Sequence, residues 1–334
     1  MKIRLLHIII FCLPFSAAAQ LLPVYGGERA GLSALSFLKN DISPRSVGMA
    51  GATASINGDA YSIFHNVAGI ADVDETSFAL TNSLLGAGIN QSFASAIFPF
   101  KSKTSSLGFS LNSLSSGAIE ERTEFQPEGT GRKVYATNVA FGVSYAQQLS
   151  RHFSIGGTLK YIYENLAEYT NHAANVDVGF LYDTEFKDLR FAVLVRNFGG
   201  NTSLMGSYIA ASYNRTGATN LESNTFPNIF SMAISMIPWK NDRHSLLTAF
   251  QLNHPNDNAE NYALGVEYAY MKLLFARAGI KINVKGQSYP SFGFGTRVMI
   301  GAHPLNIDYA AIPTDYLGFQ HVFGLRFSLN RSER

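Results

Sequence analysis

The chain has 334 residues, of which 46% are hydrophobic and 15% are charged, and its formal net charge is +2. The charged fraction lies below the roughly 25% of ordinary soluble domains, while glycine (29 residues) and aromatic residues (13%) are abundant. This composition is more typical of an all-β membrane protein than of a soluble enzyme. The near-neutral charge excludes a basic field that would attract nucleic acid, so no nucleic-acid partner is expected.

Residues 1–19 have the organisation of a secretory signal peptide. MKIR is positively charged, LLHIIIFCLPF is a short apolar run, and SAAAQ offers small residues for cleavage after Ala19. The alternative is an uncleaved anchor, but the apolar run is too short to span a bilayer as a helix. Cleavage removes Lys2, Arg4 and Cys12, the only cysteine, so the 26 basic residues become 24, equal to the 24 acidic ones. We therefore expect a mature chain with zero net charge, no disulfide and no thiol chemistry.

No uncharged apolar run after residue 19 approaches the 18 residues or more of a transmembrane helix. An exported protein of this kind is either soluble or a transmembrane β-barrel.

Residues 20–75 do not follow a strand pattern. GLSALSFLKN (31–40) is compatible with a short helix, and SPRSVGMAGATASINGDA (43–60) is small and rich in glycine. We expect this segment to be a hatch that plugs a barrel, because its apolar residues need burial; the alternative is a mobile periplasmic tail. The apolar residues concerned are Phe37, Leu38, Ile63 and Phe64.

Residues 76–334 fall into alternating segments of about ten residues, the length of a membrane-spanning β-strand. They predict strands at 76–85, 90–100, 104–114, 133–149, 153–166, 173–184, 189–198, 226–237, 244–253, 261–270, 273–283, 290–300, 303–311 and 319–329. That is about fourteen, an even number, as single-chain outer-membrane barrels require.

One face of these segments is bulky and apolar, while the other is small or charged. Val176, Val178 and Phe180, for example, alternate with Asp177 and Gly179. After the first strand, short connections alternate with longer ones, as the periplasmic turns and extracellular loops of a barrel do. The connection 86–89 is the exception, because it is short where a long one is expected. The sequence therefore predicts an all-β fold, a transmembrane antiparallel barrel of about fourteen strands in the outer membrane; the alternative is a soluble sandwich.

By strand parity, a set of charged residues points away from lipid. On the lipid-facing side at the bilayer midplane, an Arg or Lys would cost about 2–4 kcal/mol of folding free energy. The set is Lys160, Asp177, Asp183, Arg196, Glu267, Arg277, Arg297, Asp308 and Arg326. We expect these residues to form an internal ion-pair network that fills the lumen and holds the hatch. The alternative is a polar path for a solute.

The last predicted strand should pair with the first to remove the open edges of the sheet. In the last two predicted strands, Asp308 and Arg326 should face the lumen, and the apolar residues of opposite parity beside them should face lipid. The neighbours are Ile307, Tyr309, Phe323, Leu325 and Phe327.

The sequence holds neither a Gly-x-Ser-x-Gly nor a His-Glu-x-x-His motif, and its histidines form no close pair. His254 and Asp257 share a loop and are candidates for a catalytic pair, but a solvated polar loop is the preferred explanation. We predict no enzymatic activity, no metal site and no cofactor.

The two longest connections, 115–132 and 199–225, are polar with isolated aromatic residues. Phe125, Tyr208 and Tyr213 are candidate contacts for a protein partner, because aromatic side chains are common anchors at interfaces.

Several stretches resemble the PorV/PorQ family of Bacteroidota, FadL-like outer-membrane proteins linked to type IX secretion. The stretches are SFLKNDISPRSVGMAGATASINGDAYSIFHNVAGIA (36–71), FSIGGTLKYIYENLAEY (153–169), NVDVGFLYD (175–183), FAVLVRNFGG (191–200), ALGVEYAY (263–270) and DYAAIPTDYLGFQHVFGLRFSL (308–329). The family's Asn-Pro-Ala-Gly element reads Asn66-Val67-Ala68-Gly69 here, without the proline.

This resemblance implies a fourteen-stranded barrel with an N-terminal hatch. It also implies a protein-binding component of, or related to, the type IX secretion system, whose partners are secretion-system proteins or secreted cargo and outer-membrane lipid. FadL-like relatives imply the alternative, passive uptake of small hydrophobic molecules with a hydrophobic ligand in the barrel.

Overall fold

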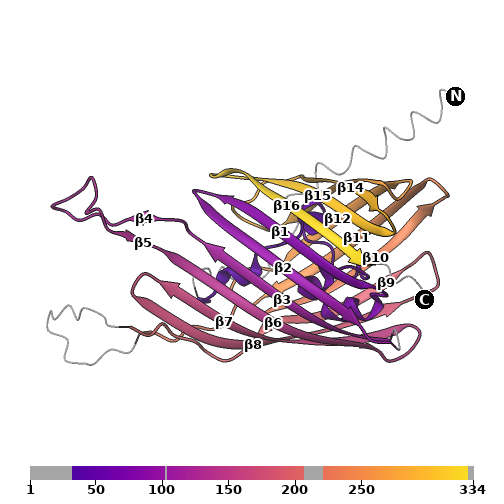
Figure 1. The fold of residues 1–334 in the computed structure, drawn as a ribbon, viewed down its shortest axis with the longest axis horizontal. Helices are drawn as coiled ribbons and strands as arrows, with labels where there is room; N and C mark the ends of the chain where they lie inside the picture. The colour runs from indigo at the N-terminus through magenta and orange to yellow at the C-terminus, as the bar shows by residue number, and fades with distance from the viewer. Residues whose placement is uncertain (1–31, 102–103, 207–220, 330–334) are drawn as a thin grey trace, which may run out of the picture.

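The computed structural model describes residues 32–101, 104–206 and 221–329. Fourteen antiparallel strands close into one barrel, in the order β1-β16-β15-β14-β13-β12-β11-β10-β9-β8-β7-β6-β3-β2 (Figure 1). Their bounds are β1 Thr76–Gly86, β2 Ile89–Pro99, β3 Ser105–Ser115, β6 Ala136–Gln148, β7 Phe153–Leu166, β8 Tyr169–Asp183, β9 Arg190–Phe198, β10 Ile229–Lys240, β11 His244–Pro255, β12 Asn261–Tyr270, β13 Leu274–Ile282, β14 Ser291–Ile300, β15 His303–Thr314 and β16 Gly318–Leu329. The predicted all-β barrel is confirmed.

Short turns and longer connections lie at opposite ends of the barrel, which we call the short-turn end and the long-loop end. The connection between β3 and β6 contains the two-stranded sheet of β4 (Ile119–Glu120) and β5 (Lys133–Val134). This β4–β5 arm extends beyond the rim at the long-loop end (Figure 1). The predicted strands 153–166 and 173–184 leave residues 167–172 as one of the longer loops. This prediction is wrong, because β7 and β8 continue pairing as far as Leu166 and Tyr169. Only two residues then remain for the turn, and Ala167 takes the left-handed conformation of a tight hairpin (φ 56°).

The wall has the face pattern of a membrane barrel, with apolar residues outside. In β8, Val176, Val178 and Phe180 are exposed while Asp177 is buried. In the closing strands, Ile307 and Leu325 are exposed while Asp308 is buried. A soluble sandwich places its apolar face inward, so the outward apolar face distinguishes the two folds.

The barrel closes where the first and last strands meet. β1 pairs with β16 from Thr76↔Leu329 to Leu84↔His321. This closure leaves the barrel without an open sheet edge, as expected from the sequence.

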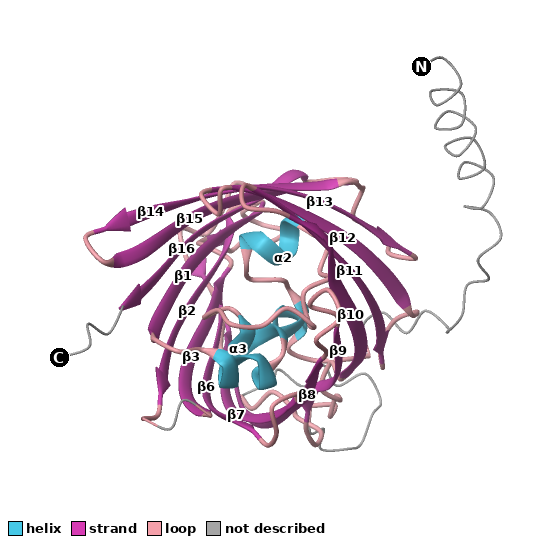
Figure 2. Cartoon of the chain, turned by 90° about the vertical axis from the view of Figure 1, so that its right-hand side faces the viewer, coloured by secondary structure: helices cyan, strands magenta, loops and turns pink. Residues whose placement is uncertain are grey.

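Residues 32–75, which we call the hatch, lie inside the barrel (Figure 2). Their elements are short: η3 (Ser36–Lys39), α2 (Pro44–Gly48), α3 (Ser62–His65) and η4 (Val67–Asp72). The sequence was compatible with a short helix over 31–40. Among the described residues of that range, the only helical structure is the 3₁₀ turn η3. Leu35 before it is left-handed and Asn40 after it is extended, so a longer helix cannot form. None of the helices in the described ranges is long and apolar enough to cross a membrane.

The hatch enters at the long-loop end and leaves at the short-turn end. Ser33 forms a parallel bridge with Thr225 in the connection between β9 and β10. The chain then descends through the lumen and joins β1 at Thr76. Glycines on the inner wall admit its backbone: a Cβ added to Gly156 would lie 2.8 Å from the carbonyl carbon of Val67. The wall therefore fits this particular path of the hatch.

Candidate functional site

An ion-pair network joins the hatch to the wall at β12, β13 and β15. Arg277 is buried and donates from Nε to Glu267 and from Nη1 to Asp308, each at 2.6 Å. Arg45 of α2 donates to the same glutamate, with 2.6 Å between Nη2 and Oε1. Glu267 thus receives one guanidinium from the wall and one from the hatch.

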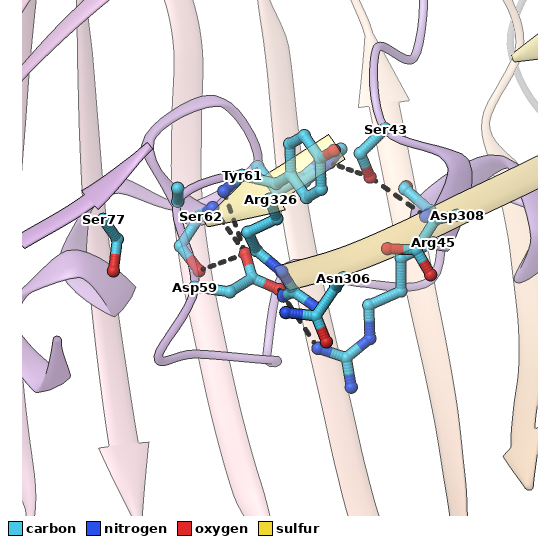
Figure 3. A network of polar contacts seen from close by, with 12 residues as sticks. Ser43, Arg45, Asp59, Tyr61, Ser62, Ser77, Asn306, Asp308 and Arg326 are labelled. Carbon is cyan, nitrogen blue, oxygen red and sulfur yellow. Dashed lines mark hydrogen bonds and ion pairs between the residues drawn. The ribbon is translucent and has the colours of Figure 1, made fainter. Parts of the chain in front are cut away.

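Asp59 of the hatch extends this network to the last strand. Its Oδ2 accepts from Arg45 at 3.2 Å and from Arg326 at 2.5 Å, so it lies between the two guanidinium groups (Figure 3). Its Oδ1 accepts the backbone N–H groups of Tyr61 and Ser62. Burial by itself raises the pKa of Asp59, but the charges of Arg326 and Arg45 outweigh it and hold the pKa below its ordinary value.

A second ion pair lies within the wall alone. Lys160 of β7 and Asp177 of β8 are 2.5 Å apart, and Asn197 binds both through its side chain and its backbone N–H. Neither Lys160 nor Asp177 forms an ion pair or side-chain hydrogen bond with the described part of the hatch, so this pair stabilises the sheet and not the plug.

The other charged residues singled out from the sequence occupy separate places. Arg297 donates to Asn306 at 3.0 Å. Asp183 pairs with Arg190. Arg196 packs against the ring of Phe64 with 5.4 Å from Cζ to the ring centroid.

The apolar hatch residues pack against the wall in two clusters. Phe37 and Leu38 belong to one with Phe226 of the β9–β10 connection. Ile63 and Phe64 belong to another that includes β2 side chains. Phe64 also lines a cavity.

The loop residues do not form a chemical site. His254 pairs with Glu260, while Asp257 pairs with Lys39 of the hatch, so the two candidates for a catalytic pair have different partners. Across the ranges 32–101, 104–206 and 221–329, no group of three His, Cys, Asp or Glu side chains is placed to hold a metal ion. Phe125 on the β4–β5 arm is 95% exposed. Tyr208 and Tyr213 lie outside the described residues.

Two cavities flank the hatch inside the barrel. The long-loop cavity has a volume of about 210 Å³, and Lys39, Asp41, His65, Arg196 and Lys281 are its ionisable lining residues together with Tyr289. The short-turn cavity has a volume of about 320 Å³, and Arg45, Ile56 and Asn57 of the hatch line it. Hatch residues face both cavities, so the hatch separates them.

Sequence reasoning missed several of these residues for different reasons. Lys281 has the same strand parity as Arg277, so the alternation in β13 is a signal that identifies it. Arg45, Asp59 and Asp41 lie in the hatch, which has no strand register, so no periodicity predicts their partners.

No family model matches the chain, and no curated protein matches it. The PorV/PorQ resemblance is therefore supported by neither comparison. Solved structures do match, among them the CymD monoaromatic hydrocarbon channel, with 14% identity, a TM-score of 0.56 and coverage of 87% of this chain and 98% of that one. The toluene transporter TbuX of Ralstonia pickettii matches with 10% identity, a TM-score of 0.51 and coverage of 86% and 97%. A FadL homologue of Pseudomonas aeruginosa matches with 11% identity, a TM-score of 0.48 and coverage of 86% and 98%.

At these identities the likeness is one of fold, and it agrees with the strand count and closure described above. The chain has the fold of a FadL-like, fourteen-stranded outer-membrane β-barrel.

Proposed function

We propose that this barrel is an outer-membrane channel for the passive uptake of small, largely apolar molecules, and that the hatch closes it in the conformation described here. The observation that carries the proposal is the division of the lumen into two cavities by the hatch. The matched structures support it, since CymD is a monoaromatic hydrocarbon channel and TbuX is a toluene transporter.

The contacts of the hatch are compatible with a movable gate. Arg45 lines the short-turn cavity as well as pairing with Glu267. Water in that cavity can solvate its guanidinium when the pair separates, which lowers the penalty of leaving a buried charge unpaired. Small residues also meet where Gly48 of α2 approaches β14, since a Cβ added to Gly48 would lie 2.9 Å from Gly293 Cα. Interlocked large side chains would resist sliding more strongly at this point.

Uptake of radiolabelled toluene by bacterial cells that lack other hydrocarbon channels tests the proposal. Cells that produce the full-length protein should take up toluene faster than cells that carry an empty vector. The Arg45→Ala variant should raise the initial rate further, because it removes two hatch ion pairs. Arg151→Ala is the matched control, since Arg151 is exposed in the turn between β6 and β7 and lines neither cavity. A folded, outer-membrane barrel that gives no increase over the empty vector would sink the proposal.

The β4–β5 arm favours a second function, the protein-binding role related to type IX secretion. Phe125 at 95% exposure is an uncovered aromatic side chain on an arm that extends beyond the barrel (Figure 1). Such side chains serve as anchors at protein interfaces. In cross-linked outer membranes of the native cell, the Phe125→Ser variant should lose protein partners that the native protein retains. Equal recovery of secretion components or cargo by both proteins would count against this role for the arm.

A further inference from the structure

The long-loop cavity contains the guanidinium of Arg196, which has no polar partner within residues 32–101, 104–206 and 221–329. Arg196 forms no ion pair within 4.0 Å and no side-chain hydrogen bond to any described residue, and its Nε is buried without an acceptor. Its Cζ lies over the face of the Phe64 ring, 5.4 Å from the ring centroid. The charge of Asp177 also acts on Arg196, but Asp177 is already paired with Lys160 at 2.5 Å. The guanidinium therefore has donors available for a ligand.

A second cation, Lys281, lines the same cavity. Lys281 of β13 has no carboxylate within 4.0 Å of Nζ among the described residues. A Cβ placed on Gly51 would lie 3.2 Å from Lys281 Nζ and 3.8 Å from Asp41 Oδ2, so the two side chains share one side of the cavity. Asp41 is already bound by the Ser43 N–H and the Ser46 hydroxyl.

The remaining ionisable groups do not cancel this positive charge. Lys39 is paired with Asp257 at 2.6 Å. Burial lowers the pKa of His65 below its ordinary value, so its imidazole is neutral near pH 7. Arg196 and Lys281 therefore face the single carboxylate of Asp41, which leaves an excess of one positive charge. A cation in a confined site of this kind is stabilised by an anionic ligand that supplies charge-assisted hydrogen bonds.

The rest of the lining is partly apolar. Phe64, Ile312 and Val322 contribute to the same cavity of about 210 Å³. If an inorganic anion occupied the cavity, these side chains would have no apolar partner. If a hydrocarbon occupied it, Arg196 and Lys281 would have no hydrogen-bond acceptor.

We propose that the long-loop cavity binds a small organic carboxylate, with the carboxylate between Arg196 and Lys281 and the apolar body against Phe64, Ile312 and Val322. The inference rests on the proposed function for its role in uptake, because it names the class of molecule that the channel would admit. Binding itself is measured on the purified barrel without any transport.

Calorimetric titration of the purified, full-length barrel in a neutral detergent tests this site, with benzoate as the probe. Benzyl alcohol has the same ring without the charge, and inorganic phosphate has charge without the ring. Benzoate should bind tighter than either one. Arg196→Gln and Lys281→Met should each weaken benzoate by about tenfold or more, as expected for the loss of a charge-assisted hydrogen bond. Heat-modifiable migration on a gel checks that each variant is folded.

Asp41→Asn provides a test of opposite sign. It removes the competing carboxylate and keeps an oxygen that can accept from Ser43 and Ser46, so benzoate should bind more tightly. Arg151→Gln is the matched control for Arg196→Gln, because Arg151 is exposed in the turn between β6 and β7, and it should leave affinity unchanged.

The inference is overturned if benzyl alcohol or phosphate binds as tightly as benzoate, or if both cation variants retain native affinity. Preferential benzoate binding combined with no uptake of toluene or benzoate would overturn the channel while leaving the site intact. Uptake of toluene without preferential benzoate binding would overturn only the site.

Discussion

Arg326 of β16 and Asp59 of the hatch form an ion pair with 2.5 Å between Nη1 and Oδ2, although they are 267 positions apart in the sequence. β16 is the strand that closes the barrel against β1. The closing strand and the hatch are thus held by one carboxylate, which Arg45 also contacts (Figure 3). Barrel closure and insertion of the hatch therefore stabilise each other.

Loss of the Arg45 side chain should destabilise the barrel and loosen the hatch. Arg45→Met leaves Glu267 and Asp59 each with one fewer cation. We expect a loss of about 3 kcal/mol in the free energy of unfolding, near the lower end for a broken buried pair because the Arg45 side chain is 17% exposed. Urea unfolding in lipid vesicles measures this change. Lys240→Met should change the stability by less than about 1 kcal/mol, since its pair with Asp188 is exposed.

Two adjacent glycines of β7 provide a test of hatch packing. A Cβ on Gly156 would lie 2.8 Å from the Val67 carbonyl carbon and 2.9 Å from Ala68 N, whereas a Cβ on Gly157 would lie 3.7 Å from Asp177 O. Gly156→Ala should therefore displace η4 and accelerate proteolysis of the hatch. Gly157→Ala should leave the cleavage rate close to that of the native protein. Equal rates for the two variants would show that the hatch does not rest on this part of the wall.

Acid should weaken the hatch through His65. Burial lowers its pKa although Asp41 lies 3.7 Å away. The unfolded histidine takes up a proton below its ordinary pKa of about 6.5, while the folded one does so only at lower pH. Stability contributed by the neutral folded form is therefore lost as the pH falls below about 6.5. Unfolding measured between pH 7 and 5 should show a steeper loss for the native protein than for His65→Gln, and parallel curves would exclude this contribution.

A matched pair of isoleucines tests which surface lies in lipid. Ile307 on β15 and Ile119 on the β4–β5 arm are exposed to similar extents, 45% and 49%. Ile307→Lys should cost about 2–4 kcal/mol of folding free energy in vesicles if it lies near the bilayer midplane. Ile119→Lys should cost little, because the arm extends beyond the barrel. Comparable losses for both variants would contradict the assigned lipid face.

Much of the wall was predictable because a strand in a membrane barrel has a strict period of two. The predicted bounds of 153–166 and 261–270 agree with those of β7 and β12. The alternation that gave Asp308 and Arg326 to the lumen also agrees with the exposed Ile307 and Leu325 beside them. The boundaries near the long-loop end were less predictable, since β8 begins at Tyr169 and not at 173.

The candidate site was less predictable than the wall. Parity placed Arg196 in the lumen, but it did not reveal that this guanidinium lacks an ion-pair partner in the part of the chain that the structure describes, while Arg277 has two. That difference depends on where the hatch passes, and the hatch has no repeating pattern.

The sequence by itself determined the barrel, its strand number and the faces of its strands, because lipid outside and a filled lumen inside impose an alternation that each strand carries locally. The tertiary structure alone decided how the hatch divides the lumen, which charges pair and which remain open to a ligand. These features arise from contacts such as Arg326 with Asp59 and Arg45 with Glu267. They join residues far apart in the chain, and no local pattern of residues encodes the distances between them.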